Sequence, residues 1–222
     1  MADSIKGAVF DVDGTLLDSM FIWDSVAADF LLAMGVAPGP ELNAELNAFG
    51  GHEIPGYLRS KYGLAMTPEE IGYGMYEMLE EFYFYKAMPK SGVFAVLDAL
   101  RGRGVRMCAA TATDRPLIEP ALRRCGLLEY FGRVFTCGEE ATSKSRPDIY
   151  LRAAAFLGTE IKDTVVFEDA LYAVKSAKAA GFPVIAVHDD TAADDREEIQ
   201  GLCDRYFASM DEIAPLLESI FR

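Results

Sequence analysis

Two aspartates near the start of the sequence, Asp11 and Asp13, follow the apolar run Ala8-Val9-Phe10 and precede a glycine. Two carboxylates so close in the chain repel each other unless a cation lies between them. Gly14 permits a sharp turn directly after the acidic pair. The question that this motif raises is which other groups the fold brings to the two carboxylates.

Polar side chains also follow three later apolar runs. Thr111 ends the run that begins at Val105, Lys144 lies in the loop after the next run, and Glu168 and Asp169 end the run that begins at Thr164. In an open parallel sheet, ligands bind outside the carboxyl ends of the strands. We therefore expect these groups to converge on one spot.

This set of residue types suits a phosphoryl group bound together with Mg²⁺. A hard divalent cation prefers oxygen ligands, which Asp11 and Asp169 can supply, and its charge would relieve the repulsion within the opening motif. The hydroxyl of Thr111, nearby backbone N–H groups and the ammonium of Lys144 would hold the phosphoryl oxygens.

Short apolar runs that alternate with helical patterns must position these groups. Continuously apolar strands between helices indicate a parallel sheet that is covered on both faces. The expected strands are Gly7–Phe10, Val105–Ala110, Arg133–Thr136, Thr164–Phe167 and Pro183–Val187. The expected helices are Val93–Arg101, Arg115–Cys125, Asp148–Leu157 and Ala170–Ala180. The sequence therefore predicts an α/β fold with a Rossmann-like, doubly wound parallel sheet.

One segment departs from this alternation and is predicted to be helical throughout. Residues 1–17 and 88–222 are expected to form the Rossmann-like core, and residues 18–87 an inserted helical cap domain. Thr67 is the expected N-cap of the last helix of this insertion, because Pro68 follows it and Glu70 completes a capping box. The aromatic run Phe82 to Tyr85 in that helix is expected to be helix core rather than pocket lining.

Composition excludes several classes of protein. The formal net charge of −14, from 35 acidic and 21 basic residues, argues against nucleic-acid binding, which needs cations. The sequence has no apolar run long enough to span a membrane, and its first ten residues are not expected to act as a signal peptide, because charged residues come too early. Its four cysteines lack Cys-x-x-Cys spacing, which favours reduced thiols in a cytoplasmic protein. The oligomeric state cannot be predicted from the sequence.

Taken together, these motifs resemble those of the haloacid dehalogenase superfamily of phosphotransferases. The segments "DVDGT" and "ATAT", the lysine of "SKSRPD" and the pair "ED" resemble its four motifs, in the family's order and spacing. The helical insertion resembles the cap of the subgroup that contains β-phosphoglucomutase and many small-metabolite phosphatases. The third motif departs from the family pattern, because Ser145 follows Lys144 where proline is common.

The resemblance implies a role for each motif. Asp11 would attack phosphorus to form an aspartyl-phosphate, and Asp13 would protonate the leaving oxygen and then activate water. Mg²⁺ would be held by Asp11, the main-chain carbonyl of Asp13 and Asp169, with Glu168 as a direct or water-mediated ligand. The phosphoryl oxygens would be stabilised by Thr111, the amide of Ala112, and Lys144.

The favoured function is a Mg²⁺-dependent phosphatase that acts on a small phosphorylated metabolite resembling a sugar phosphate. A β-phosphoglucomutase-type phosphotransferase is the first alternative, but Trp23 stands where β-phosphoglucomutase carries a cap histidine, and His52 or Ile54 stands where it carries a cap arginine. A signalling or binding module phosphorylated on aspartate is a further alternative. Trp23 and His52 are weak candidates for substrate contact, and Trp23 could equally serve packing.

The acidic segment "HDDTAADDREE", residues 188–198, is interpreted as a solvated loop. A second metal site that involves His188 is a minor alternative.

Overall fold

The computed structural model describes residues 5–217 of the 222-residue chain. These residues divide into two compact units. The first contains the chain up to Met20 and from Ala87 onward, and the second is Phe21–Lys86. No helix within residues 5–217 combines the length and the apolar character needed to cross a bilayer.

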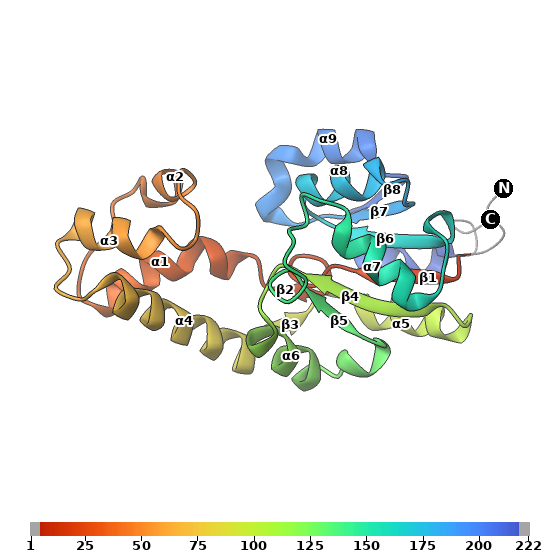
Figure 1. The fold of residues 1–222 in the computed structure, drawn as a ribbon, viewed down its shortest axis with the longest axis horizontal. Coiled ribbons are helices and arrows are strands. Elements are labelled where there is room, and N and C mark those ends of the chain that lie inside the picture. Colours follow the sequence, from red (N-terminus) through yellow and green to blue (C-terminus); the bar gives the residue numbers. More distant parts are fainter. Residues whose placement is uncertain (1–4, 218–222) are drawn as a thin grey trace. The chain divides into compact units, whose positions relative to one another are not determined.

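The first unit is built around a parallel sheet whose strand order is β5-β4-β1-β6-β7-β8 (Figure 1). The strands are β1 (Gly7–Phe10), β4 (Arg106–Thr111), β5 (Val134–Thr136), β6 (Thr164–Glu168), β7 (Val184–Val187) and β8 (Arg205–Phe207). Each neighbouring pair is parallel. The predicted fold class is therefore confirmed.

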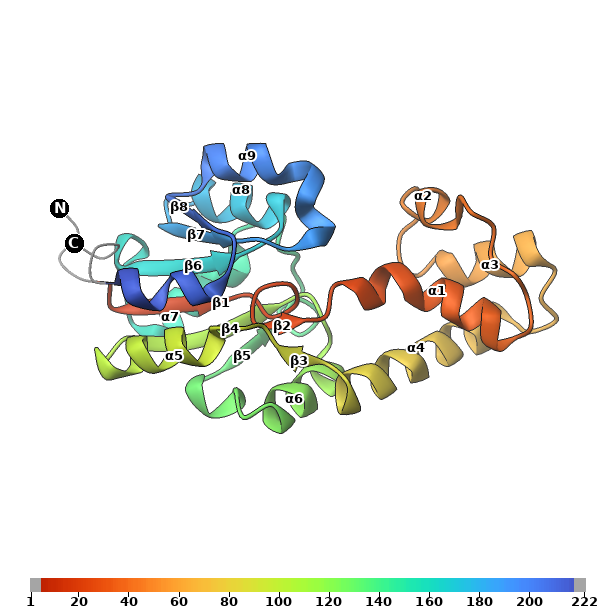
Figure 2. The same ribbon diagram turned by 180° about the vertical axis from the view of Figure 1, so that it is seen from behind.

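Helices cover both faces of the sheet, which is why its strands are apolar on both sides. Figure 1 shows α7 in front of the sheet, and Figure 2, seen from behind, shows α5 in front. Val9 packs in a core cluster with residues of α7 and α8, whereas the ring of Phe10 stacks on Phe167 at 4.2 Å between centroids. The helices are α5 (Val93–Gly102), α6 (Arg115–Arg124), α7 (Asp148–Leu157), α8 (Leu171–Ala179) and α9 (Arg196–Leu202).

The five predicted strands are present, with ends that shift by at most one residue. The prediction lacked three short strands: β8, and the antiparallel pair β2 (Leu17–Asp18) and β3 (Met88–Pro89). Two or three residues are too few for an alternating or continuously apolar pattern to develop. The pair β2 and β3 brings together the two points at which the chain leaves and re-enters the first unit.

The second unit consists of the helices α1 (Phe21–Ala33), α2 (Leu42–Leu46), α3 (Ile54–Tyr62) and α4 (Pro68–Tyr85). Its own apolar core contains Ala27, Phe30, Leu31, Leu42, Leu58 and Ile71. The predicted capping box is confirmed, since Thr67 Oγ1 accepts from the Glu70 amide at 3.2 Å and Glu70 Oε2 accepts from the Thr67 amide at 2.8 Å. Phe82 and Tyr83 are buried, as expected of helix core, whereas Tyr85 is exposed.

Candidate active site

The strand order places the ends of β4, β1 and β6 side by side at the carboxyl edge of the sheet. Phe10, the last residue of β1, is level with Ala109 on one side and with Phe167 on the other. Asp11 therefore follows β1 at the level where Glu168 ends β6. The sheet register alone brings together residues that are more than 150 positions apart in the chain.

An acidic group forms at this edge. Asp11, Glu168 and Asp169 each offer one carboxylate oxygen, and these oxygens all lie within 4.8 Å of one another. The three residues are buried, with at most 5% of their surface exposed. Buried carboxylates at this separation repel strongly, so the group requires positive charge nearby.

Lys144 supplies part of that charge. Its ammonium, 3% exposed, pairs with Asp11 Oδ1 and donates to Glu168 Oε1 at 2.7 Å. Burial alone would lower the pKa of Lys144, but the two carboxylates outweigh it and raise this pKa above its usual value. The hydroxyl of Tyr150, on α7, donates to the same Glu168 oxygen at 2.7 Å.

One ammonium does not balance three carboxylates. Burial raises the pKa of Asp11 to about 6 even though Lys144 opposes the shift, and burial with the charges of Asp11 and Glu168 raises the pKa of Asp169 well above its usual value. Asp11 Oδ2 is buried and accepts no hydrogen bond from the described residues. An all-oxygen donor set with surplus negative charge and an unused lone pair fits a hard metal cation.

Three side-chain hydroxyl groups donate hydrogen bonds to the Asp13 carboxyl. Its Oδ1 accepts from Ser19 at 2.7 Å, and its Oδ2 accepts from Thr113 at 2.7 Å and from Thr111 at 3.3 Å. The Thr111 hydroxyl also accepts from the Thr113 amide at 3.0 Å. These bonds fix the orientation of the Asp13 carboxyl beside the acidic group, and they join it to the end of β4.

The turn after Asp13 requires a glycine. Gly14 has a φ of +85°, which residues other than glycine rarely adopt. A Cβ at this position would lie 2.4 Å from Asp169 Oδ2. The next residue, Thr15, donates its hydroxyl to Asp169 Oδ1 at 2.9 Å. The opening motif thus contacts Asp169 directly.

The structure brings Asp11, Lys144, Glu168 and Asp169 together in one group, and it joins Asp13 to Thr111 by a hydrogen bond at the end of the neighbouring strand. Ala112 follows directly after β4, between Thr111 and Thr113. Trp23 and His52 belong to the second unit. The Trp23 indole N–H donates to the Tyr83 hydroxyl at 3.1 Å, and His52 lies in an exposed turn before α3. The roles of all these residues toward a substrate stay predictions.

Sequence reasoning assigned no role to several residues that contact the network. Thr15, Ser19 and Thr113 are hydroxyl residues close to the motifs, and that proximity is the signal that could have found them. No such signal exists for Tyr150, because its place in the sequence is that of an apolar position in a helix. The description of residues 188–198 as a solvated loop is wrong, because Asp190–Asp195 form a 3₁₀ helix and α9 begins at Arg196. Asp189 is also not solvated, since it is 7% exposed and bonds Lys90 at 2.8 Å.

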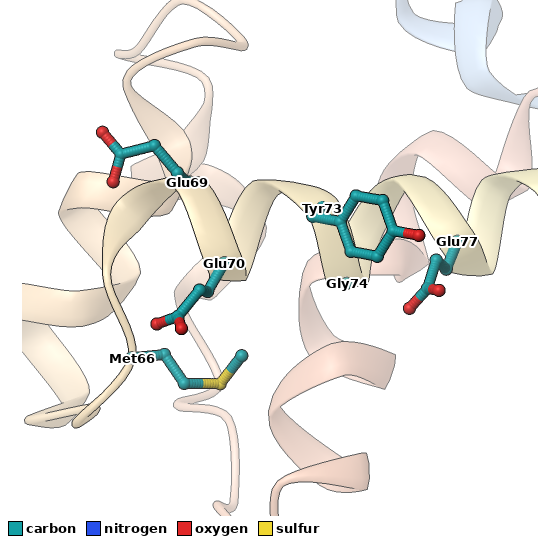
Figure 3. A pocket seen from close by; sticks show the side chains of 6 residues that line it. All are labelled: Met66, Glu69, Glu70, Tyr73, Gly74 and Glu77. Carbon is teal, nitrogen blue, oxygen red and sulfur yellow. The ribbon is translucent and has the colours of Figure 1, made fainter.

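A separate pocket of about 430 Å³ lies on the second unit (Figure 3). Its lining residues are Met66, Glu69, Glu70, Tyr73, Gly74 and Glu77. Three carboxylates and no basic side chain line it, so it would repel a phosphorylated ligand. This pocket does not resemble the predicted phosphate site.

Comparison with protein families gives a match to haloacid dehalogenase-like hydrolases over residues 5–181. Hexitol phosphatase A of Escherichia coli is 31% identical over 188 residues, which cover 82% of this chain and 83% of that protein. The chloroplastic protein SUPPRESSOR OF QUENCHING 1 of Arabidopsis thaliana is 29% identical over 193 residues, which cover 82% of this chain but only 18% of that protein.

Among solved structures, a candidate β-phosphoglucomutase from Thermotoga maritima superposes with a TM-score of 0.84. The superposition covers 97% of this chain and 100% of that chain, at 21% sequence identity. At this identity the likeness bears on the fold alone, and it agrees with the sheet and helices described above.

Proposed function

Because this chain belongs to the haloacid dehalogenase-like hydrolases, we propose that it is a Mg²⁺-dependent phosphatase that hydrolyses a small phosphorylated metabolite through an aspartyl-phosphate. The observation that carries this proposal is the buried pairing of Lys144 with Asp11 and Glu168, with Asp13 two residues after Asp11 and bonded to Thr111 at the end of the neighbouring strand. The match to a hexitol phosphatase supports a substrate that resembles a sugar phosphate.

In the first step a carboxylate oxygen of Asp11 attacks phosphorus, and the bond from phosphorus to the leaving oxygen breaks. The carboxylic acid of Asp13 gives its proton to that leaving oxygen. Lys144 neutralises charge on the transferring phosphoryl oxygens, together with the amide of Ala112 and the hydroxyl of Thr111.

In the second step water attacks phosphorus, and the Asp13 carboxylate takes a proton from this water. Inorganic phosphate leaves and the Asp11 carboxylate is regenerated. Mg²⁺, held by Asp11, Asp169, Glu168 and the main-chain carbonyl of Asp13, would supply positive charge that draws the phosphoryl group to Asp11. The surplus of buried carboxylates at this edge of the sheet supports that assignment.

The test is phosphate release from p-nitrophenyl phosphate with Mg²⁺, followed in the wild type and in Asp11→Asn. Loss of the nucleophile should lower turnover by about three orders of magnitude or more. Asp194→Asn, a change at an exposed position of the 3₁₀ helix Asp190–Asp195, is the matched control and should keep wild-type turnover. Unchanged turnover in Asp11→Asn would refute the mechanism.

The alternative of a phosphoglucomutase-type phosphotransferase uses the same core residues. It predicts interconversion of hexose 1- and 6-phosphates primed by a bisphosphate, which phosphate release does not require. The further alternative, a signalling or binding module phosphorylated on aspartate, predicts a long-lived phosphoprotein and no multiple turnover. Within the helical unit, Trp23 bonds Tyr83 and offers no imidazole to a substrate, which supports the phosphatase over the mutase. The cytoplasmic location stays a prediction.

A further inference from the structure

Lys90 joins three separate parts of the first unit. Its ammonium donates to the main-chain carbonyl of Gly14 at 2.5 Å, to the carbonyl of His188 at 2.9 Å and to Asp189 Oδ2 at 2.8 Å. The side chain of Lys90 is 17% exposed and that of Asp189 is 7% exposed. All three donor protons of the ammonium are therefore used in a largely buried site.

Asp189 is itself held in place. Its Oδ1 accepts from the Thr191 amide at 3.0 Å and from the Thr191 hydroxyl at 2.6 Å, which leaves Oδ2 for Lys90. Burial opposes ionisation of Asp189, but the hydrogen bonds from Lys90 and Thr191 outweigh burial and keep its pKa below the usual value. The loop after β7 thus presents a fixed negative charge to Lys90.

The other end of this contact is the turn that follows Asp13. The Gly14 amide donates to the Leu17 carbonyl at 2.9 Å, and the Lys90 amide donates to the Leu16 carbonyl at 2.9 Å. Lys90 therefore contacts this turn twice, through its backbone and through its ammonium. Gly14 has a positive φ, so the backbone departs here from the strand conformation, and the Gly14 carbonyl accepts from the Lys90 ammonium.

We propose that Lys90, anchored by Asp189, is a positioning residue that fixes the Asp13–Gly14 turn and so aims the Asp13 carboxyl at the leaving oxygen. This inference rests on the proposed phosphatase function. Ser19 and Thr113 orient the Asp13 carboxyl through hydrogen bonds to its oxygens, while Lys90 holds the carbonyl of Gly14, the next residue. Loss of Lys90 would release the turn and leave the two carbonyls and Asp189 without their shared donor.

A proton donor matters most when the leaving group is a poor one. An aryl phosphate such as p-nitrophenyl phosphate expels a stable anion and needs little protonation, whereas an alkyl phosphate needs the proton of Asp13. A misplaced Asp13 should therefore slow phosphoenzyme formation from an alkyl phosphate far more than from an aryl phosphate. A general loss of structure would slow both alike.

The experiment measures phosphoenzyme formation by rapid quench with p-nitrophenyl phosphate and with hexitol phosphate. For Lys90→Met we expect the rate with the alkyl substrate to fall about ten- to a hundredfold more than the rate with the aryl substrate. Asp189→Asn should show the same pattern more weakly, and Lys90→Arg should restore much of the rate. Lys178→Met is the matched control, since Lys178, on α8, pairs with Asp204 at 2.7 Å and neither residue belongs to the turn.

Amide hydrogen exchange over residues 11–19 gives a second readout that needs no turnover. We expect faster exchange in Lys90→Met and Asp189→Asn than in the wild type or in Lys178→Met. Equal losses on both substrates, or unchanged exchange in the turn, would overturn the positioning role. A wild type without phosphatase turnover but with faster exchange in the variants would instead refute the proposed function and leave the structural role of Lys90 standing.

Discussion

At the scale of single residues, the candidate site holds more negative than positive charge. Three buried carboxylates, Asp11, Glu168 and Asp169, share one ammonium, that of Lys144. Burial is the main cause that raises the pKa of Asp11 to about 6. The same charges that would draw a cation and a phosphoryl group into the site therefore oppose folding when no cation is bound.

This imbalance predicts a pH dependence of stability in the metal-free protein. The pKa of Asp11 is raised from about 3.8 to about 6 on folding, so the folded chain binds this proton more tightly than the unfolded chain. The stabilisation from that proton is full at low pH and is lost as pH rises between these values. Asp11→Asn lacks the titration, so its free energy of unfolding relative to the wild type should rise from pH 4 to pH 7.5 in urea titrations with a chelator. A difference that is constant with pH would contradict the buried, repelled state of Asp11.

At the scale of elements, the strand ends place the candidate site residues, and a capping box marks the start of one helix. Three adjacent parallel strands end at one edge of the sheet, so Asp11 and Glu168 meet there, and the long side chain of Lys144 reaches them from the loop after β5. In the second unit, α4 starts at a capping box that satisfies two backbone N–H groups. Such a signal lies within four consecutive residues, so the sequence alone indicates where the helix begins.

The capping box predicts a measurable contribution of Thr67 to stability. Thr67→Ala removes the acceptor of the Glu70 amide and should lower the free energy of unfolding by about 1 kcal/mol in urea denaturation. Thr67→Ser keeps the hydroxyl and should lose much less. If both variants lost the same amount, the side-chain hydrogen bond would not be the source of the effect.

At the scale of the whole molecule, the chain has a net charge of −14, and its acidic group lies at the sheet edge of the larger unit. A divalent cation could act on such a chain in two ways. It could bind the acidic group, or it could screen negative charge over the whole surface. The two effects differ in whether they depend on one buried carboxylate.

We expect millimolar Mg²⁺ to raise the melting temperature of the wild type by roughly 2–8 °C, since a ligand at many times its Kd stabilises the folded state. Asp169→Asn should lose most of this shift, because it removes a carboxylate of the acidic group. The exposed variant Asp194→Asn, which has the same change in net charge, should keep it. Equal shifts in both variants, measured by calorimetry, would indicate general screening instead of a site.

The sequence alone determined the parallel α/β sheet, the helical segment and the groups that end the strands. These follow from local patterns: apolar runs of strand length, helical spacing, and the Thr67 capping box. The order of the four motifs also indicated the family, the haloacid dehalogenase-like hydrolases. Short elements such as β2, β3 and β8 could not be predicted, because two or three residues carry no periodic signal.

Only the tertiary structure decided which side chains complete the site. Tyr150 reads as a core position of a helix, and Asp189 reads as one charge of a solvated acidic loop, yet Tyr150 bonds Glu168 and Asp189 anchors Lys90 beside the opening turn. Hydrogen bonds and ion pairs of this kind join residues far apart in the chain, and they depend on distances of a few ångströms. Local sequence specifies which elements form, whereas those distances are set by the packing of elements against one another, which no local pattern contains.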